Sequence, residues 1–412
     1  MSGGASLPDA PRIDRERMRQ ARLERALGEM ESREIDALIL GREANARYVS
    51  DARRLWLAGT RPFGPGCVLV RESREIHLLS NTDDGVPETI PPANFYGMSW
   101  NPLRLLDALK RIPGLASARR VGIDASTPLM TALLPRAVPR AELVDGAEAM
   151  HAARRIKTAD EIACIRAALA ITEAALADVI AALAPGVPER HLAGVFQEGI
   201  ARLGVTTPAL DGIFCATPRH VDALPGLATE PRPASRLPFR QLASERPLAD
   251  GDLVAISVGT LYLGYEGTVA LTWPCGGERA VPPASRVREL DTTSPGQRLH
   301  QRWRAVLDRL LAECRPGRSC GDLRRAYAAS GEPPSGLPIA HGIGLGCEPP
   351  LVGGELGGEG DAACVLEPGM VLALQAYVWS EGVGGYFGKE TVRITAEGPE
   401  VLGELSRGHL AS

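Results

Sequence analysis

A histidine in a glycine-rich run is the strongest candidate for chemistry in this sequence. His341 stands in the run His-Gly-Ile-Gly-Leu. Glycines let a backbone pass close to a bound ligand because they carry no Cβ. An imidazole titrates near neutral pH, so it can act as a base, an acid or a hydrogen-bond donor. The alternative is a core histidine whose ring is satisfied by the protein itself.

Lys389 is the second candidate, and its chemistry depends on its surroundings. Burial lowers the pKa of a lysine and makes the amine either a base or a clamp for an anion. An ion pair with Glu266 or Glu348 is the competing interpretation. Glu390 adjoins Lys389 in the sequence, but neighbours on a strand point to opposite faces. Glu348, seven residues after His341, is itself a candidate acid or base.

Two segments without periodicity offer further groups to a ligand. Residues 217–238 are rich in proline, and we predict a lid or flap there over plain disorder, because long loops in compact domains are usually functional or disordered. His220 on this loop either enters the site or is simply solvated. Nearer the N-terminus stand Arg54 and Trp56, and arginine suits a carboxylate because its guanidinium is a planar bidentate donor. A charged surface loop is the alternative there.

The eight cysteines are scattered, and no Cys-x-x-Cys pair occurs. Cys314 and Cys320 flank a Pro-Gly pair at a spacing that matches no common zinc site. The pattern predicts free thiols in a reducing cytoplasm. Cys215 and Cys347 are candidates to line a pocket, although a small buried thiol is a commoner role than a nucleophile.

Composition describes an ordinary globular protein of two domains, with 412 residues, 44% of them hydrophobic and 23% charged. A net charge of -4 gives no footprint for nucleic acid. No apolar run is long enough to span a membrane. Residues 1–13 are polar and contain proline, which favours a flexible tail over a signal peptide. We expect a cytoplasmic protein whose partners include neither nucleic acid nor a membrane.

Periodicity predicts an alternating α/β domain over residues 14–150. Its expected elements are a helix at 14–33, a buried strand at 35–40, a hairpin of 67–70 with 76–79, a helix at 102–111 and a strand at 120–123.

The second half of the chain opens with a long helix and then repeats itself weakly. Thr158-Ala-Asp-Glu161 is a capping box, and apolar residues at a 3-4 spacing from 162 to 183 predict one buried face. Pro185-Gly186 ends this helix. Pro185-Gly186 and Pro316-Gly317 each precede a helix with a leucine seven residues after the proline, a weak sign of internal duplication.

Four segments in order resemble the creatinase, aminopeptidase P and prolidase family. They are the linker helix at Arg155 to Arg166, the metal-bearing hairpin at Arg246 to Tyr265, the histidine segment at His341 to Leu345 and the last two metal strands at Leu366 to Val392. The resemblance spans residues 14 to 403. It implies an α/β (α+β) fold, with a creatinase-like N-terminal domain and a C-terminal pita-bread domain (151–412) built on a curved antiparallel sheet. It also implies a homodimer in which one subunit's N-terminal domain roofs the other's site.

The resemblance also assigns the positions where metal-dependent members hold two metals. Those positions here are Ser257, Thr268, His341, Gln375 and Lys389. Four carboxylates are replaced and one cation is added, whereas two divalent ions need carboxylates and repel an ammonium. Phe239 stands where the family has a proton-shuttling histidine. We therefore expect no metal and no other cofactor. Two interpretations stay open, a rebuilt polar pocket and a decayed site.

These observations predict a metal-independent, creatinase-like enzyme that acts on a small, polar, carboxylated metabolite. The reaction is C–N bond hydrolysis or a related lyase or rearrangement step, with a specialised biosynthetic pathway as one setting. The proposed catalytic residues are His341 as acid or base, Lys389 as anion clamp or base, and Glu348. The proposed substrate-binding residues are Ser257, Thr268, Gln375, Phe239, Tyr265, Glu266, His220, Arg54 and Trp56.

Two other functions remain as alternatives. One is a non-catalytic pseudo-peptidase that binds a ligand or a protein. The other is an Xaa-Pro aminopeptidase-type metallopeptidase, which the four lost carboxylates disfavour.

Overall fold

The computed structural model describes residues 13–53, 65–99, 101–210, 212–220, 240–276, 295–333, 336–353 and 359–404. The chain divides into two compact units, one of Asp14–Thr158 and one that comprises Ala159–Ser412. The sequence placed this boundary near residue 150. The division comes later because the helix at Ala147–Arg155 packs against the first helix of the N-terminal unit.

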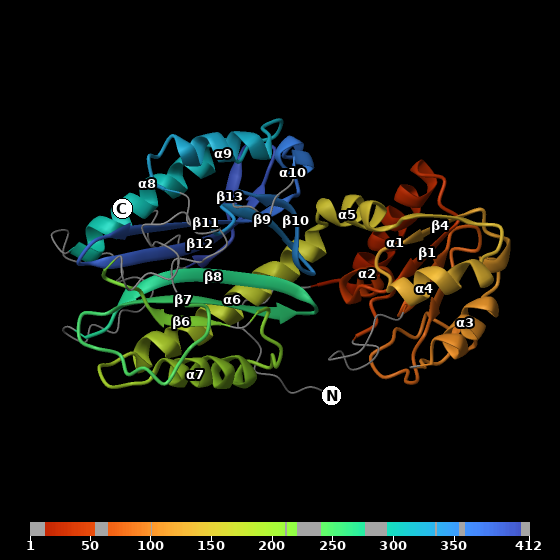
Figure 1. Cartoon of the computed structure of the whole chain (residues 1–412), viewed down its shortest axis with the longest axis horizontal. Helices are drawn as coiled ribbons and strands as arrows, with labels where there is room; N and C mark the ends of the chain where they lie inside the picture. The colour runs from red at the N-terminus through yellow and green to blue at the C-terminus, as the bar shows by residue number, and fades with distance from the viewer. Residues whose placement is uncertain are drawn as a thin grey trace. The chain divides into compact units, whose positions relative to one another are not determined.

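The N-terminal unit is built on a five-stranded mixed sheet (Figure 1). Its order is β3-β2-β1-β4-β5, in which β1, β4 and β5 are parallel and the β2–β3 hairpin is antiparallel. The strands are β1 (Ala37–Leu40), β2 (Cys67–Val70), β3 (Ile76–Leu78), β4 (Arg120–Ile123) and β5 (Glu142–Asp145). The helices are α1 (Arg15–Ser32), α2 (Glu43–Ser50), α3 (Pro102–Lys110), α4 (Pro128–Leu133) and α5 (Ala147–Arg155).

Local sequence explains where α1 begins and how its inner face is held. The side chain of Asp14 caps the helix by accepting a hydrogen bond from the N–H of Arg17 at 3.0 Å. Arg22 is fully buried on the inner face, and its guanidinium lies 2.6 Å from the carboxylate of Asp51. A buried arginine needs such a partner, because an isolated buried charge is costly.

The C-terminal unit has an eight-stranded antiparallel sheet with helices packed against it (Figure 1). The order is β10-β9-β11-β12-β8-β7-β6, and β13 pairs with β12. The strands are β6 (Ile213–Ala216), β7 (Leu253–Tyr262), β8 (Tyr265–Pro274), β9 (Ala340–Gly344), β10 (Gly346–Val352), β11 (Val371–Ser380), β12 (Gly384–Ile394) and β13 (Pro399–Val401). The helices are α6 (Ala159–Ala182), α7 (Glu189–Arg202), α8 (Pro295–Glu313), α9 (Cys320–Ala328) and α10 (Glu359–Ala363).

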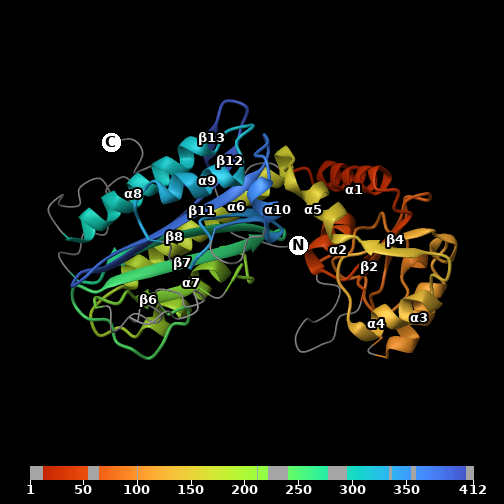
Figure 2. The same cartoon turned by 45° about the horizontal axis from the view of Figure 1, so that its top comes forward.

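The two halves of this unit follow the same plan. Each has two helices followed by a long hairpin, with α6 and α7 before β7–β8, and α8 and α9 before β11–β12. Helix α6 packs on β7 and β8, while α8 packs on β11 and β12. Figure 2 shows α8 running alongside β11 and β12. The hairpins meet where β8 pairs with β12. The order of elements therefore repeats, as the two Pro-Gly pairs suggested.

The face of α6 predicted to be buried is buried from Ile162 to Val179, and Leu183 lies beyond the end of the helix and is partly exposed. The one polar member of this face has hydrogen-bond partners. Ile165, Leu169 and Leu176 lie in the core with Thr172 among them. The Thr172 hydroxyl lies within 3.0 Å of the Ala168 carbonyl, the Gly267 carbonyl and the Thr260 hydroxyl. A buried hydroxyl with partners costs little. Thr172 therefore ties α6 to the β7–β8 hairpin.

No helix in the described ranges is both long enough and apolar enough to cross a membrane.

Candidate active site on the sheet face opposite the helices

Strand register places on one face of the C-terminal sheet all five positions that the family resemblance assigns to metal ligands. Directly paired residues in neighbouring strands share a face. Ser257 and Lys389 both pair with Ala270, and Gln375 pairs with Lys389. The remaining pairs are Thr268 with Gly259 and His341 with Ala373, on strands that continue the same alternation.

This face is turned away from α6. Val254, Ile256 and Val258 of β7 belong to the apolar cluster that includes residues of α6 and α7. Because successive side chains of a strand alternate, Ser257 points to the other side.

Two glycines bring the helices close behind the site. A Cβ on Gly267 would lie 2.2 Å from the backbone nitrogen of Leu169 in α6. A Cβ on Gly388 would lie 2.3 Å from the indole of Trp303 in α8. Gly267 precedes Thr268, and Gly388 precedes Lys389, so close helix packing fixes the strand beside each of these two side chains.

Lys389 is a buried cation, 5% exposed, at the centre of this face. Its ammonium donates a hydrogen bond to the Thr268 hydroxyl at 3.4 Å. Among the residues that the structure describes, it forms no ion pair. Burial lowers the pKa of Lys389, and electrostatic interactions with Glu266 and then Cys347 oppose that shift. The sequence left open an ion pair with Glu266 or Glu348; the influence of Glu266 is electrostatic, without direct contact.

Glu266 is a buried carboxylate that lacks the usual donors. It is 1% exposed, and its Oε1 accepts no hydrogen bond from the described part of the chain. Burial raises its pKa; the charge of Lys389 acts against this shift and the charge of Glu348 adds to it. Glu266 is two residues before Thr268 on β8, so the two side chains share the site face.

His341 is held as a neutral imidazole. Its Nδ1 lies 3.2 Å from the carbonyl oxygen of Gly342, and since a carbonyl only accepts, Nδ1 donates. This contact leaves the lone pair on Nε2. Burial and the nearby charge of Lys389 lower the pKa of His341 to about 4, and the bond to Gly342 opposes them only in part. His341 is therefore uncharged at neutral pH.

Two of the three neutral replacements, Gln375 and Ser257, differ in how much of their hydrogen-bonding capacity the protein itself already satisfies. The Gln375 amide donates to the Pro338 carbonyl at 2.7 Å, which fixes its orientation. Ser257 is 8% exposed, and its hydroxyl has no hydrogen bond within the described ranges. Ser257 is therefore the neutral side chain with its full hydrogen-bonding capacity left for a ligand.

Glu348 lies close to these groups, on β10. It is 6% exposed, and its carboxylate covers Gly344, where a Cβ would lie 2.7 Å from Oε2. Its charge raises the pKa of Glu266. Its neighbour Cys347 is exposed, unlike the buried thiol that the sequence favoured. Protein atoms still shield part of the Cys347 thiol from water, which with the nearby carboxylates raises its pKa to about 11.

The structure does not bring Tyr265 into the site. Its side chain is buried on the face that meets α6, where its hydroxyl donates to Glu161 at 2.8 Å. The prediction that Tyr265 binds substrate is therefore corrected. The physical reason is the alternation of a strand, which separates Tyr265 from Glu266.

His220 is likewise placed apart from His341. Its Nδ1 lies 2.8 Å from the Glu381 carboxylate, and the two side chains are 67% and 56% exposed. Glu381 follows the end of β11, far along that strand from the residue paired with His341. Three other predicted positions, Arg54, Trp56 and Phe239, lie outside the described residues, as do residues 221–238 of the predicted lid.

The side chains at the five positions do not fit a pair of divalent cations. The set contains one imidazole and one ammonium, and an ammonium repels a dication instead of ligating it. Within the described ranges, no group of three or more His, Cys, Asp and Glu side chains is arranged to hold a metal ion.

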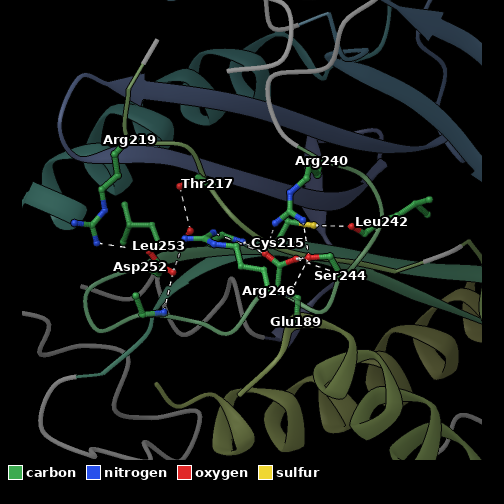
Figure 3. A network of polar contacts seen from close by, with 12 residues as sticks. Glu189, Cys215, Thr217, Arg219, Arg240, Leu242, Ser244, Arg246, Asp252 and Leu253 are labelled. Atoms are coloured by element: carbon green, nitrogen blue, oxygen red, sulfur yellow. Dashed lines mark hydrogen bonds and ion pairs between the residues drawn. The ribbon is translucent and has the colours of Figure 1, made fainter. Parts of the chain in front are cut away.

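A second network of charged side chains, shown in Figure 3, links the first turn of α7 with the loop before β7 and was not predicted. Glu189, fully buried, accepts hydrogen bonds from the Arg240 guanidinium at 2.6 Å and the Ser244 hydroxyl at 2.8 Å. Asp252 accepts from Arg246 at 3.1 Å. These contacts hold the loop to α7 and β7. The signal available in the sequence was a glutamate in the first turn of a helix, directly after a proline.

A cavity of about 370 Å³ lies near the ends of β8 and β12. Its lining is mostly apolar and includes Arg219, Leu253, Trp273, Gln297, His300 and Tyr386. None of the five site positions lines it, so it is distinct from the candidate site.

Family models match both units of the chain. The model of metallopeptidase family M24 matches residues 163–396, and that of the creatinase/prolidase N-terminal domain matches residues 22–156. The chain belongs to metallopeptidase family M24. The predicted family and the predicted fold, an N-terminal creatinase-like domain followed by a pita-bread domain, are thereby confirmed.

Similar proteins cover nearly the whole chain at low identity. An Xaa-Pro dipeptidase of Pyrococcus horikoshii is 24% identical over 92% of this chain and 95% of its own length. A creatinase of a Bacillus species is 24% identical over 91% and 87%. The crystal structure of the Pyrococcus horikoshii prolidase matches with a TM-score of 0.69 at 21% identity, covering 92% of this chain and 97% of that one. This structural likeness concerns the fold.

Proposed function

We propose that the chain is a metal-independent enzyme on a creatinase-like scaffold, acting on a small, polar, carboxylated metabolite. The proposed reaction cleaves or rearranges a C–N or related bond, by hydrolysis or by a lyase step. One observation carries the proposal: the ammonium of Lys389 is buried without an ion pair in the described residues. The family resemblance assigns this position to a metal ligand in the metal-dependent members. A creatinase and an Xaa-Pro dipeptidase are each 24% identical to the chain, so the similarity is compatible with a small-metabolite substrate and with a peptide.

Substrate binding follows from that charge. A carboxylate entering the site gives Lys389 the close counter-ion that it lacks, and a buried ion pair with good geometry offsets its desolvation. The Ser257 hydroxyl and the oxygen of Gln375 offer hydrogen bonds to neighbouring polar groups of the substrate. We therefore propose Lys389 as an anion clamp.

Proton transfer is assigned to two groups whose pKa values are pushed in opposite directions. The pKa of His341 is lowered, so its Nε2 is free to accept a proton, from a water molecule in hydrolysis or from the substrate in a lyase step. Burial raises the pKa of Glu266, and the charge of Glu348 adds to this shift, so we assign Glu266 as the group that passes a proton to the leaving nitrogen. Acid and base assignments commonly follow such separated pKa values.

The site is proposed to be completed by a second copy of the chain. The resemblance leads us to propose a homodimer in which Arg54 and Trp56 of one subunit approach the other subunit's substrate. Light scattering on the purified protein tests the dimer, and a mass of one chain at working concentration would contradict it.

The first experiment is metal content by plasma mass spectrometry, before and after incubation with manganese, cobalt and zinc. We expect less than about one-tenth of an equivalent throughout, because the ammonium of Lys389 repels a dication. One or two tightly held equivalents would overturn metal independence, and peptides with proline in the second position would then be the substrates to try.

The second experiment screens small carboxylates by thermal shift, each beside its uncharged amide. We expect carboxylates alone to stabilise the protein, and Lys389→Met to abolish the effect. Lys110→Met, an exposed lysine of the N-terminal unit, is the matched control. His341→Gln should bind the same ligand and lose turnover. Binding with turnover unchanged in His341→Gln would refute the assigned base, and binding without any turnover would indicate a binding protein.

A further inference from the structure

Two cysteines far apart in the sequence lie directly opposite one another in the C-terminal unit. Cys320 is the first residue of α9, and Cys364 follows α10. Their segments form a short antiparallel bridge between Ser319 and Val365, and the N–H of Cys320 donates to the carbonyl of Cys364 at 2.9 Å. Opposed residues that share such a bond have Cα atoms about 5.5 Å apart. That separation lies within the range that a disulfide spans.

The two thiols are also in contact and have unequal access to solvent. The Cys320 thiol donates a hydrogen bond to the sulfur of Cys364, and this bond, followed by burial, raises the pKa of Cys320. Cys320 is fully buried, whereas Cys364 is partly exposed. A donor next to Cys364 stabilises a thiolate there. The pair therefore combines a solvent-accessible sulfur, Cys364, with an adjacent buried and protonated thiol, Cys320. This is the arrangement of a redox-sensitive cysteine with its resolving partner.

We propose that Cys364 and Cys320 form a reversible disulfide when the protein meets a peroxide, with Cys364 oxidised first and Cys320 as the resolving thiol. This inference is independent of the proposed function. The thiolate of Cys364 attacks one peroxide oxygen, the O–O bond breaks, and hydroxide leaves and takes up a proton. The sulfur of Cys320 then attacks the resulting sulfenic acid, the S–O bond breaks, and a second water leaves. Two thiols and one hydrogen peroxide give one disulfide and two waters.

The cross-link joins two parts of the fold that lead to, or pack against, strands of the candidate site. Leu366, two residues after Cys364, is bonded to Arg318 and leads toward β11, the strand that carries Gln375. Helix α9 packs against β10, which carries Glu348. A disulfide between Cys320 and Cys364 therefore restrains the helix and the connection that precede these two strands.

Two other cysteines serve as internal controls. Cys314 is fully buried, and burial followed by the charge of Glu313 raises its pKa to about 12, so it stays a protonated, inaccessible thiol. Cys347 is exposed, but it lies on β10 and not in either of the two segments that carry Cys320 and Cys364. We expect neither to enter the disulfide.

The test treats the purified full-length protein with a few equivalents of hydrogen peroxide, followed by alkylation under denaturing conditions and peptide mapping. We expect a linked peptide pair containing Cys320 and Cys364, a mass lower by about 2 Da, and full reversal by dithiothreitol. Cys347→Ser and Cys314→Ser should behave as the parent protein. A pair that includes Cys314, or equal alkylation of Cys364 with and without peroxide, would overturn the proposal.

Single variants separate the two roles. Cys320→Ser should leave a sulfenic acid on Cys364 that dimedone captures, while Cys364→Ser should leave Cys320 a free thiol. Dimedone labelling of Cys320 in Cys364→Ser would reverse the assigned order and refute it. Circular dichroism confirms that each variant is folded, and Cys320→Ala replaces Cys320→Ser if the buried hydroxyl prevents folding.

Discussion

Two buried glutamates in the C-terminal unit differ in the hydrogen-bond donors that surround their carboxylates. Glu189 is fully buried and accepts hydrogen bonds from Arg240, from the hydroxyl and N–H of Ser244 and from the N–H of Ala216 (Figure 3). Glu266 is 1% exposed, yet its Oε1 accepts no hydrogen bond from the described residues, and its compensating charge on Lys389 is not in direct contact.

The contrast separates a carboxylate that stabilises the fold from one that is still able to interact with a ligand. A carboxylate with all its donors in place holds a loop and has no capacity left for a ligand. A carboxylate without donors costs stability in the empty protein, and such groups with shifted pKa values gather at functional sites. On this ground the sheet face with Glu266 and Lys389, and not the network in Figure 3, is the candidate for chemistry.

The largest effect is expected from removing the structural carboxylate. Glu189→Ala leaves two backbone N–H groups and the Arg240 guanidinium without their acceptor. We expect the free energy of unfolding to fall by about 3 kcal/mol, measured by urea denaturation. Arg190→Ala is the control, since its exposed ion pair with Glu245 should contribute less than about 1 kcal/mol. Equal losses of unfolding free energy in the two variants would show that the hydrogen bonds of Glu189 contribute no more than an exposed ion pair.

The next effect is a pH dependence that belongs to His341. Its folded-state pKa of about 4 lies below the ordinary 6.5, so between these values the unfolded chain binds a proton that the folded chain does not. Stability is therefore complete above pH 6.5 and falls as pH drops toward 4.

We expect the parent protein to lose about 2 kcal/mol more than His341→Gln between pH 7.5 and pH 5. Urea unfolding of both proteins at the two pH values measures this difference. His77, whose pKa burial also lowers, is common to both proteins and cancels. Parallel losses in parent and variant would show that His341 titrates normally.

A smaller effect, of opposite sign to the first, is expected when both site charges are removed together. The double variant Glu266→Gln, Lys389→Met should be as stable as the parent protein or more stable by about 1 kcal/mol, because two buried charges in poor contact contribute little. Each single variant should be less stable than the double variant, since it leaves one charge uncompensated. A double variant weaker than the parent by several kcal/mol would place Glu266 in the same structural class as Glu189.

Local pattern was enough to predict most of the elements. The strand expected at 120–123 is β4, and the helix expected at 14–33 is α1, because an alternation or a 3-4 spacing of apolar residues is a property of the segment alone. The five site positions followed from the resemblance. Tyr265 was misplaced although period-two alternation on β8 could have separated it from Glu266.

The hydrogen bonding and the pKa values of the site groups could not be predicted from the sequence. Whether Glu189 has four donors and Glu266 none on Oε1 depends on residues that only the fold brings near, such as Arg240. The pKa of His341 depends on its burial and on Lys389, 48 positions further along the chain (389 − 341 = 48). Such long-range effects leave no periodic signal in a single sequence.

The smallest effect is expected at His220, which has the residue type of an active-site group and the surroundings of a surface one. Its ring and the Glu381 carboxylate are 67% and 56% exposed, so water screens their attraction. We expect His220→Ala to change the free energy of unfolding by less than about 0.5 kcal/mol and to leave the binding of carboxylates unchanged. A loss of ligand binding in this variant, with stability intact, would mean that the segment carrying His220 closes over the site and that exposure in the empty protein understates its role.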